Sequence, residues 1–256
     1  MRIATWNVNS IKARLPRVVP WLEEHDPDVL CMQETKQADA AFDATPFQAL
    51  GYEVAHHGDG RWNGVAIASR VGLDDIVRGF EGPSDDAGTR LVAATCDGIR
   101  VHSVYVPNGR ELSSEWYPIK LAWLEELRAL LAPRCAAGEE VLVAGDFNVA
   151  PGDLDVWDPA ALEGMTHVSA AEREAVAELL DLGLVDAVPT LHPGEQRFSW
   201  WDYRGGSFHK NHGMRIDLVL LSSSLATSLR EAGTDREARK GEKPSDHAPV
   251  VVDLDR

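Results

Sequence analysis

The sequence predicts a single α/β domain built from two similar halves. Short apolar runs bounded by turn residues recur through its 256 residues, with helical patterns between them, which is the order typical of an α/β protein. Several runs are apolar on both faces, so we expect a sheet covered by a second layer. A weak repeat is formed by "ATWNVNS" at 4–10 and "AGDFNVAP" at 144–151, and each segment places an Asn at the end of a predicted strand. Two strand–helix halves whose strand ends meet at one site would produce this repeat.

The predicted strands are short runs rich in Val, Ile, Leu and Ala that stop at turn residues. They cover residues 2–7, 28–34, 64–70, 90–96, 99–106, 140–148, 215–222 and 247–255. No linker, charge run or low-complexity tract divides them. We therefore expect residues 1–256 to form one domain.

Three longer stretches have helical spacing. In 13–25, the apolar residues repeat with a helical period, although Pro16 and Pro20 must lie in the first turn or kink the helix. The stretch 113–133 offers serines as N-caps and a proline at its end. The stretch 169–183 has a Ser cap, a Glu three residues later and a terminal Gly, which predicts a capping box.

Composition favours an ordinary globular protein, with 44% hydrophobic and 26% charged residues. No apolar stretch approaches the roughly 20 residues of a membrane helix, so we expect no membrane association. The N-terminus lacks the apolar core of a signal peptide. Three cysteines stand far apart without metal-binding spacing, which favours free thiols and a cytoplasmic location.

The net charge of −16 argues against a nucleic-acid partner at first sight. Local charge differs from the total. Between residues 196 and 217, four Arg and Lys residues and two Asp residues give a local net charge of +2. Residues 9–17 include three basic residues and no acid. The total charge therefore lowers the expectation of DNA binding without removing it.

Polar side chains gather where the predicted strands end or begin. They are Asn7, Asn9, Glu34, Tyr105, Asn108, Asp146, Asn148, Asp217, Asp246 and His247. Ligands of sheet-based folds bind at one end of the strands, so these distant residues could converge there. Asp217 is the hardest to explain structurally, because it interrupts an apolar run and a buried carboxylate is costly unless it is paired.

The chemistry of this set favours a hard cation. Carboxylate and amide oxygens from Glu34, Asp146, Asn7 and Asn148 suit Mg²⁺ or Mn²⁺ better than structural Zn²⁺. Mg²⁺ held by one or two carboxylates is an arrangement used in phosphoryl transfer. His247 could act on the attacking water or contact the phosphate, with an Asp fixing its tautomer.

Other catalytic classes lack their motifs. The chain has no G-x-S-x-G elbow for a serine hydrolase, and no P-loop or G-x-G-x-x-G segment for a nucleotide. Three readings remain: a metal-dependent DNA nuclease, a phosphatase or phosphodiesterase acting on a small or lipid phosphate, and a catalytically inactive DNA-binding or scaffold protein.

Seven blocks along the whole chain resemble exonuclease III-type apurinic/apyrimidinic (AP) endonucleases of the endonuclease/exonuclease/phosphatase superfamily. They are "TWNVNSIKARL", "CMQETK", "VYVPNGRE", "VLVAGDFNVAPGDLD", "GLVDA", "FSWWDYRGGSFHKNHGMRIDLVLLSSSL" and "EKPSDHAPV". The resemblance implies a two-layer β-sandwich flanked by helices, with four α/β/β/α layers and pseudo-twofold halves.

The resemblance also implies roles in catalysis. Glu34 is similar to the principal Mg²⁺ ligand, with Asn7 nearby and Asp246 supporting the metal site; Mn²⁺ could substitute. Asp146 and Asn148 match the pair that positions the water and holds the phosphate, and Tyr105 matches a phosphate-facing tyrosine. His247 matches the catalytic histidine and Asp217 the acid that orients it. Whether Asp146 or His247 is the general base stays open, as does the number of metal ions.

The implied substrate is double-stranded DNA with abasic sites or damaged 3′ ends. Such an enzyme hydrolyses the phosphodiester 5′ to an abasic site and has 3′→5′ exonuclease and 3′-phosphatase capacity, acting as a monomer. An abasic sugar could enter an apolar pocket too small for a nucleotide. Expected DNA contacts come from the polar, basic and pocket-wall residues Asn9, Lys36, Arg61, Asn108, Arg110, Trp200, Arg204, Lys210 and Met214.

Overall fold

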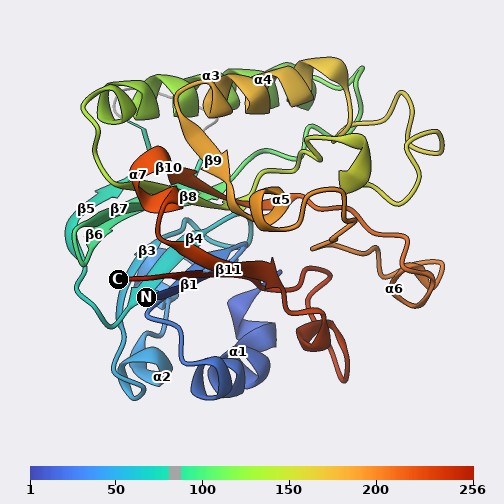
Figure 1. Cartoon of the computed structure of the whole chain (residues 1–256). Coiled ribbons are helices and arrows are strands. Elements are labelled where there is room, and N and C mark those ends of the chain that lie inside the picture. The colour runs from blue at the N-terminus through green and yellow to red at the C-terminus, as the bar shows by residue number, and fades with distance from the viewer. Residues whose placement is uncertain (81–87) are drawn as a thin grey trace.

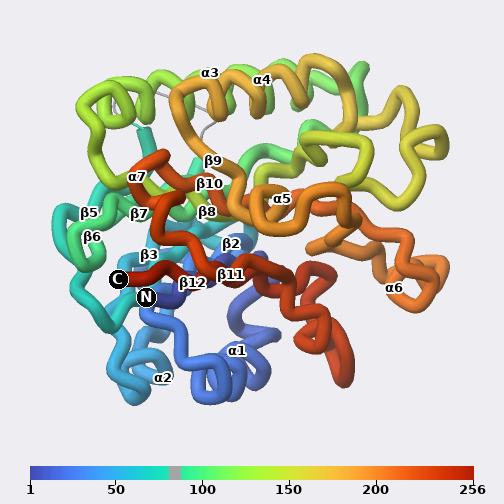
Figure 2. Tube along the Cα trace, viewed as in Figure 1, coloured from blue at the N-terminus to red at the C-terminus, as the bar shows by residue number. Residues whose placement is uncertain are grey.

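Two six-stranded sheets pack face to face and carry helices on both outer faces (Figure 1). The computed structural model describes residues 1–80 and 88–256. Helices α3 and α4 cover one sheet, and α1 and α2 cover the other (Figure 1). The two termini lie side by side (Figure 2), where the Met1 ammonium donates to the Leu254 carbonyl at 2.7 Å. The expected four-layer α/β/β/α sandwich is confirmed.

Both sheets are mixed. The first has the order β11 (Leu229–Thr234), β12 (Val250–Leu254), β1 (Arg2–Asn7), β2 (Val29–Gln33), β4 (Val65–Ser69) and β3 (Glu53–His57). The second has the order β5 (Asp74–Arg78), β6 (Leu91–Cys96), β7 (Ile99–Tyr105), β8 (Val141–Asp146), β10 (Asp217–Ser222) and β9 (Leu184–Asp186).

The helices differ widely in length. They are α1 (Ile11–His25), α2 (Thr45–Gln48), α3 (Trp116–Ala136), α4 (Ala170–Leu180), α5 (Ala187–Leu191), α6 (Ser207–Lys210) and α7 (Ser223–Ala226), with 3₁₀ turns η1 (Asp39–Ala41), η2 (Asp153–Asp155) and η3 (Arg236–Arg239). Among the described residues, no helix has the length and apolar character needed to cross a bilayer.

Strand pairing makes the two halves equivalent. Read from β11 to β3, neighbouring strands pair antiparallel, antiparallel, parallel, antiparallel and antiparallel. The same series appears in the second sheet read from β9 to β5. Each half therefore has one central parallel pair, β1·β2 or β7·β8, and the expected pseudo-twofold relation is confirmed.

Every predicted strand exists, but four strands were not predicted: β3, β5, β9 and β11. These four are the edge strands of the two sheets. An edge strand has one bonded side and often one solvated face, so its apolar pattern is weak. In β5, for example, the side chains are exposed except for one that is half-buried.

The three predicted helices form, with two corrections. Helix α1 runs through Pro16 and Pro20, neither of which lies in its first turn; both are exposed, so the carbonyls that they leave unpaired face solvent. Helix α3 begins at Trp116 with Glu115 in the N-cap position, although the hydroxyl of Ser114 accepts from the Trp116 amide at 3.1 Å, and it passes Pro133 to end at Ala136. Only one hydrogen bond is lost there, within the last turn, where helices fray.

The capping box of α4 is confirmed: Ser169 accepts from the amide of Glu172, and the Glu172 side chain accepts from the Ser169 amide. The core lies between the two sheets, where inward residues such as Ile3, Val101 and Leu142 are fully buried.

The close approach of β7 and β8 requires glycine at position 145. A Cβ on Gly145 would lie 1.9 Å from the Val104 carbonyl oxygen, and the backbone has φ +155°. We expect Gly145→Ala to lower the free energy of unfolding by at least about 3 kcal/mol. Urea denaturation measures this loss.

The control is Gly138→Ala, because Gly138 also has positive φ (+73°) but has no atom within 4 Å of an added Cβ. Its expected cost is about 1 kcal/mol, from backbone strain alone. Equal losses in the two variants would contradict the steric argument.

Candidate active site

The site lies at one edge of the sandwich, where strands of both sheets end or begin. Asn7 ends β1 opposite Gln33, the last residue of β2, and Glu34 follows. In the other sheet, Asp146 ends β8 opposite both Tyr105 and Asp217. Because β1·β2 and β7·β8 are parallel pairs, their carboxyl ends deliver these side chains to one place.

Strands β1 and β8, one from each sheet, end in the same turn. The Asn9 amide donates to Asn7 Oδ1 at 3.0 Å, and the Asn148 amide donates to Asp146 Oδ1 at 2.9 Å. Asn9 and Asn148 both have left-handed backbones, with φ 43° and 52°. The weak sequence repeat is therefore a repeated Asx turn, a motif in which Asn and Asp bond their own backbone.

Asn7 joins the carboxylates of the two sheets. Its Nδ2 donates to Glu34 Oε1 and to Asp146 Oδ2, both at 2.9 Å. Asn7 is fully buried and Asp146 nearly so. A buried carboxylate needs such donors, because each loses its hydration.

The acidic cluster fits a divalent cation. Ligand atoms of Glu34, Asp146 and His247 all lie within 4.8 Å of one another. Burial, followed by the charge of Asp217, raises the pKa of Asp146 to about 7 despite the nearby imidazole of His247. A cation would relieve this crowding of negative charge. The oxygens of Glu34 and Asp146 would hold a hard ion such as Mg²⁺.

His247 is fixed by Asp217. Its Nδ1 lies 2.8 Å from Asp217 Oδ2, and its Nε2 lies 3.7 Å from Asp146 Oδ2. Burial lowers the pKa of His247, but the charges of Asp217 and Asp146 and the hydrogen bond to Asp217 outweigh burial and raise it to about 10. The imidazole is therefore a cation near neutral pH.

Asp246 lies outside the cluster formed by Glu34, Asp146 and His247. Its Oδ1 accepts from Asn9 Nδ2 at 2.9 Å, and its Oδ2 accepts from Trp200 Nε1 at 3.1 Å. Although burial raises the pKa of Asp246, the charge of His247 and these two bonds lower it below its usual range. The expected metal support from Asp246 would thus be indirect, because its carboxylate is not part of the group of ligand atoms that lie within 4.8 Å of one another.

Asn9 connects Asp246 to Glu34 through Lys36. The Lys36 ammonium donates to Asn9 Oδ1 at 2.5 Å and lies 2.9 Å from Glu34 Oε2. Glu34 and Lys36 both have left-handed backbones. Lys36, expected to contact DNA, therefore also orients the candidate metal ligand.

Tyr105, Asn108 and Asn148 form the opposite side of the site. Asn108 Nδ2 donates to Asn148 Oδ1 at 3.0 Å, and Asn148 Nδ2 donates to the Val106 carbonyl at 3.0 Å. Burial, followed by the charges of Glu34 and Asp146, raises the pKa of Tyr105 well above its ordinary value. Tyr105 therefore keeps its proton and can donate a hydrogen bond to an anion.

Trp200 and Met214, predicted to form the wall of a sugar pocket, lie together, although Met214 is buried. They pair in a short antiparallel bridge and pack with Val156 and Ile216. Trp200 is half-buried and close to His247, with which it also pairs. The neighbouring Trp201 is instead a core residue, 1% exposed.

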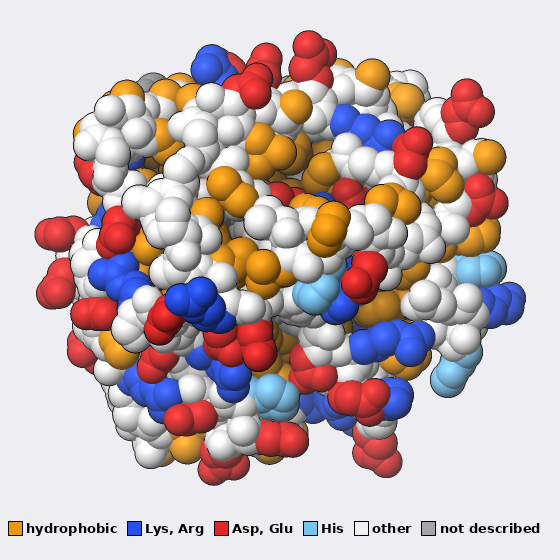
Figure 3. Space-filling model, viewed as in Figure 1, with side chains coloured by type: hydrophobic (Ala, Val, Ile, Leu, Met, Phe, Trp, Pro, Cys, Tyr) orange, Lys and Arg blue, Asp and Glu red, His pale blue; other side chains and the backbone are white. Residues whose placement is uncertain are grey.

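Four other predicted DNA contacts lie at the surface, three on loops and Lys210 at the end of α6. Arg61, Arg110, Arg204 and Lys210 are all exposed. Arg204 pairs with Asp202 at 2.7 Å, and the guanidinium of Arg110 lies 4.5 Å from the Trp116 ring centroid. Figure 3 shows His and basic side chains at the α6 end of this face, and further basic side chains interspersed with acids over the rest.

Three residues near Asn148 were missed by sequence reasoning: Lys120, His167 and Glu172. His167 has φ 77°, and its Nδ1 bonds the Asn148 carbonyl. Burial, followed by the charge of Lys120, lowers the pKa of His167 to about 4, so this histidine is neutral. Lys120 and Glu172 are completely buried. The signal for both was a charged residue at an apolar-face position of a helix.

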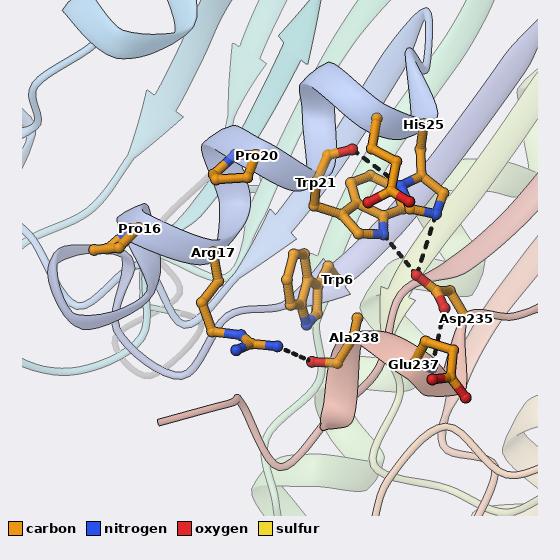
Figure 4. Close-up of a pocket in the computed structure, with 10 residues that line it drawn as sticks. Trp6, Pro16, Arg17, Pro20, Trp21, His25, Asp235, Glu237 and Ala238 are labelled. Atoms are coloured by element: carbon orange, nitrogen blue, oxygen red, sulfur yellow. Dashed lines mark hydrogen bonds and ion pairs between the residues drawn. The ribbon is translucent and has the colours of Figure 1, made fainter. Parts of the chain in front are cut away.

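A separate cleft of about 400 Å³ lies between α1 and η3 (Figure 4). Trp21 and His25 line it, and both approach Asp235, with the Trp21 indole donating at 2.8 Å. Trp6 also lines it and donates to the His247 carbonyl at 3.1 Å. None of the predicted site residues is among the residues that line this cleft.

The Asp217–His247 pair predicts a pH dependence. In the metal-free protein, Asp217→Asn should bring the pKa of His247 from about 10 to near or below the ordinary histidine value of about 6.5. Since the folded-state pKa is raised, the stabilisation is complete below about pH 6.5 and disappears as the pH rises to about 10. NMR titration of the His247 ring measures the shift; an unchanged pKa in Asp217→Asn would contradict it.

Comparisons with known proteins agree with this geometry. The Endonuclease/Exonuclease/phosphatase family matches residues 4–247. Exodeoxyribonuclease III of Haemophilus influenzae is 33% identical over 99% of this chain and 100% of its own. A 3′-5′ exonuclease from Neisseria meningitidis and an AP endonuclease from Archaeoglobus fulgidus are each 39% identical, superpose with TM-score 0.97 and are covered completely.

A further Neisseria structure, 38% identical with TM-score 0.97, is a 3′ phosphatase bound to product DNA hairpin. The family match spans both sheets and reaches from the first strand to His247. The chain belongs to the endonuclease/exonuclease/phosphatase family.

Proposed function

We propose that the protein is a divalent-metal-dependent DNA-repair nuclease. Its reactions would be hydrolysis of the phosphodiester 5′ to abasic sites and removal of nucleotides or phosphate from 3′ ends. The observation that carries this proposal is the cluster of the half-buried Glu34 with the buried Asp146 and His247, whose ligand atoms lie within 4.8 Å of one another and whose imidazole is held by Asp217. Relatives that share the whole chain carry the names exodeoxyribonuclease III and AP endonuclease.

Glu34 and Asp146 would hold the cation, with Mg²⁺ as the expected ion and Mn²⁺ as a substitute. When bound, the cation stabilises negative charge on the phosphate oxygens. Lys36 fixes the Glu34 carboxylate from one side and Asn7 from the other. The cation ligands are therefore preorganised before DNA binds.

Protonation states separate the roles of Asp146 and His247. His247 holds its proton near neutral pH, since Asp217 and Asp146 raise its pKa to about 10. A protonated imidazole donates to a phosphate oxygen and accepts no proton from water. Asp146 is therefore the group left in the cluster to accept the proton of the attacking water, through a carboxylate oxygen that does not bind the cation.

The remaining groups stabilise charge on the phosphorus. The phenol of Tyr105 keeps its proton, and Asn148 has an amide hydrogen left after its bond to the Val106 carbonyl. Asn7 adds no donor to the phosphate, because both hydrogens of its amide bind Glu34 and Asp146. Tyr105, Asn148 and His247 are the donors that match the negative charge that grows in a phosphoryl transition state.

Substrate choice would depend on the loops around this centre. Trp200 and Met214 form an apolar wall beside His247, suited to a sugar that lacks its base. The exposed Arg61, Arg110 and Lys210 are available to backbone phosphates. As the family resemblance implies, we expect the protein to act as a monomer. The three free cysteines fit a reducing cytoplasm.

The proposal predicts that Asp146→Asn abolishes turnover while DNA binding persists. Loss of the general base should lower kcat by about 10²- to 10⁴-fold. The assay uses three duplexes, carrying an abasic analogue, a 3′-phosphate at a nick, or neither, with Mg²⁺ or with EDTA. Fluorescence anisotropy measures binding in parallel.

Asp253→Asn is the control, because Asp253 pairs with Arg2 at the far end of β12. It should keep wild-type kcat. Activity of the wild type in EDTA, or equal cleavage of the undamaged duplex, would sink the proposed function. Near-normal turnover of Asp146→Asn would show that its role is misassigned.

A further inference from the structure

A lysine and a glutamate pair in the core between α3 and α4. Lys120 and Glu172 have no exposed side-chain surface and form an ion pair. On α3, the buried residues Lys120, Leu124, Leu127 and Leu131 share one face. A lysine on an apolar face is strongly disfavoured unless its ammonium has partners. Its contacts therefore indicate what the charge does.

The Lys120 ammonium has three acceptors. One is Glu172 Oε1, and the other two are the carbonyls of Asn148 at 2.6 Å and of Asn108 at 3.3 Å. These carbonyls belong to two different loops, one after β7 and one after β8. The same two residues meet through their side chains, Asn108 Nδ2 to Asn148 Oδ1. Lys120 thus binds, from the core side, the backbone carbonyls of the two residues whose side-chain amides face the site.

Both loops have backbones that need support. Asn148 has φ 52° and Arg110 has φ 59°, a conformation that costs energy for residues with a side chain. Gly109 lies directly over the lysine, because an added Cβ would be 3.0 Å from Lys120 Cδ. The stem of Lys120 therefore packs under the loop while its ammonium binds the carbonyls.

Glu172 ties the same centre to the start of α4. Its carboxylate accepts from Thr166 Oγ1, the His167 amide and Ser169, besides Lys120. The segment 166–169 in turn places His167 against the Asn148 carbonyl. The two side chains that bind the Asn148 carbonyl, Lys120 and His167, thus both depend on the buried Lys120–Glu172 ion pair.

We propose that Lys120 is a positioning residue for the hydrolytic site, one that fixes Asn148 and Asn108 through their carbonyls while Glu172 balances its charge. It lies outside the cluster that would touch the phosphate and acts through the backbone of those two loops. The proposal rests on the proposed function of Asn148 as a phosphate-facing amide.

The test is the double variant Lys120→Met/Glu172→Gln. Removing both charges together avoids leaving one buried charge unpaired, and Gln can still complete the capping box of α4. Thermal unfolding with circular dichroism checks that the variant folds. Arg2→Met/Asp253→Asn is the matched control, since it removes a bidentate ion pair at the opposite end of β1 from Asn7.

The first readout is steady-state kinetics on the duplex substrate that the wild type cleaves. With Asn148 displaced, we expect kcat to fall about 100-fold, while KM stays within about threefold because the exposed DNA contacts are unchanged. The control pair should keep wild-type kcat. A folded double variant with kcat within about twofold of the wild type would overturn the proposal, since loss of about 1 Å of alignment costs far more.

Hydrogen–deuterium exchange is the second readout and needs no activity. The segments 106–110 and 146–150 should exchange faster in the double variant, while 7–10, at the other half of the site, stays unchanged. Unchanged exchange in both loops would also overturn the positioning role. An inactive wild type would refute the proposed function, and the exchange experiment would still decide whether Lys120 holds the loops.

Discussion

The site depends on one neutral side chain, the amide of Asn7, that binds a carboxylate from each half of the molecule. Its two hydrogens reach Glu34, which follows β2, and Asp146, which ends β8. A positively charged side chain in place of Asn7 would attract both acids but would not define the distance between them. An amide donates one bond in each direction and adds no charge, so it sets the distance between the acids. The two sheets are thereby registered at the point where a phosphate would bind.

Around that amide, the positive groups compensate the acids unequally. Lys36 serves Glu34, and His247 is held between Asp217 and Asp146. Lys120 lies deeper and serves the backbone of the loop that follows Asp146. Asp146 itself receives only hydrogen bonds and a distant imidazole, so burial dominates and raises its pKa to about 7. The acid with the least compensation is the one best suited to accept a proton.

More of the site than of the surrounding fold could be predicted from the sequence. Asn7, Asp146 and Asp217 were predictable because each is a polar break in an otherwise buried strand. Their convergence follows from parallel pairs, whose carboxyl ends share an edge. Edge strands such as β3 and β5 were not predictable, because half-solvated strands lose the apolar pattern. The family fold did follow, but only from the resemblance of the seven sequence blocks.

Other contacts required coordinates. Asp246 stands next to His247 in the chain, yet its carboxylate faces Asn9 and Trp200. Neighbouring residues of an extended chain point in opposite directions, so the adjacency of Asp246 and His247 in the sequence does not make them hydrogen-bond partners. Lys120 and Glu172 were hidden for another reason. Each occupies an apolar-face position of a predicted helix, but only the packing of α3 against α4 and the site loops shows which groups the two charges bind.

The central claim is that strand ends of both sheets build a single cation site. Paramagnetic broadening of assigned amide signals by Mn²⁺ in the DNA-free protein tests it most directly. With one equivalent of Mn²⁺, the account predicts that the signals of Asn7 and Glu34 broaden together with those of Asp146 and His247. The far ends of the same strands should stay sharp. Broadening confined to one sheet, or centred on the cleft of Trp21 and Asp235, would contradict the account.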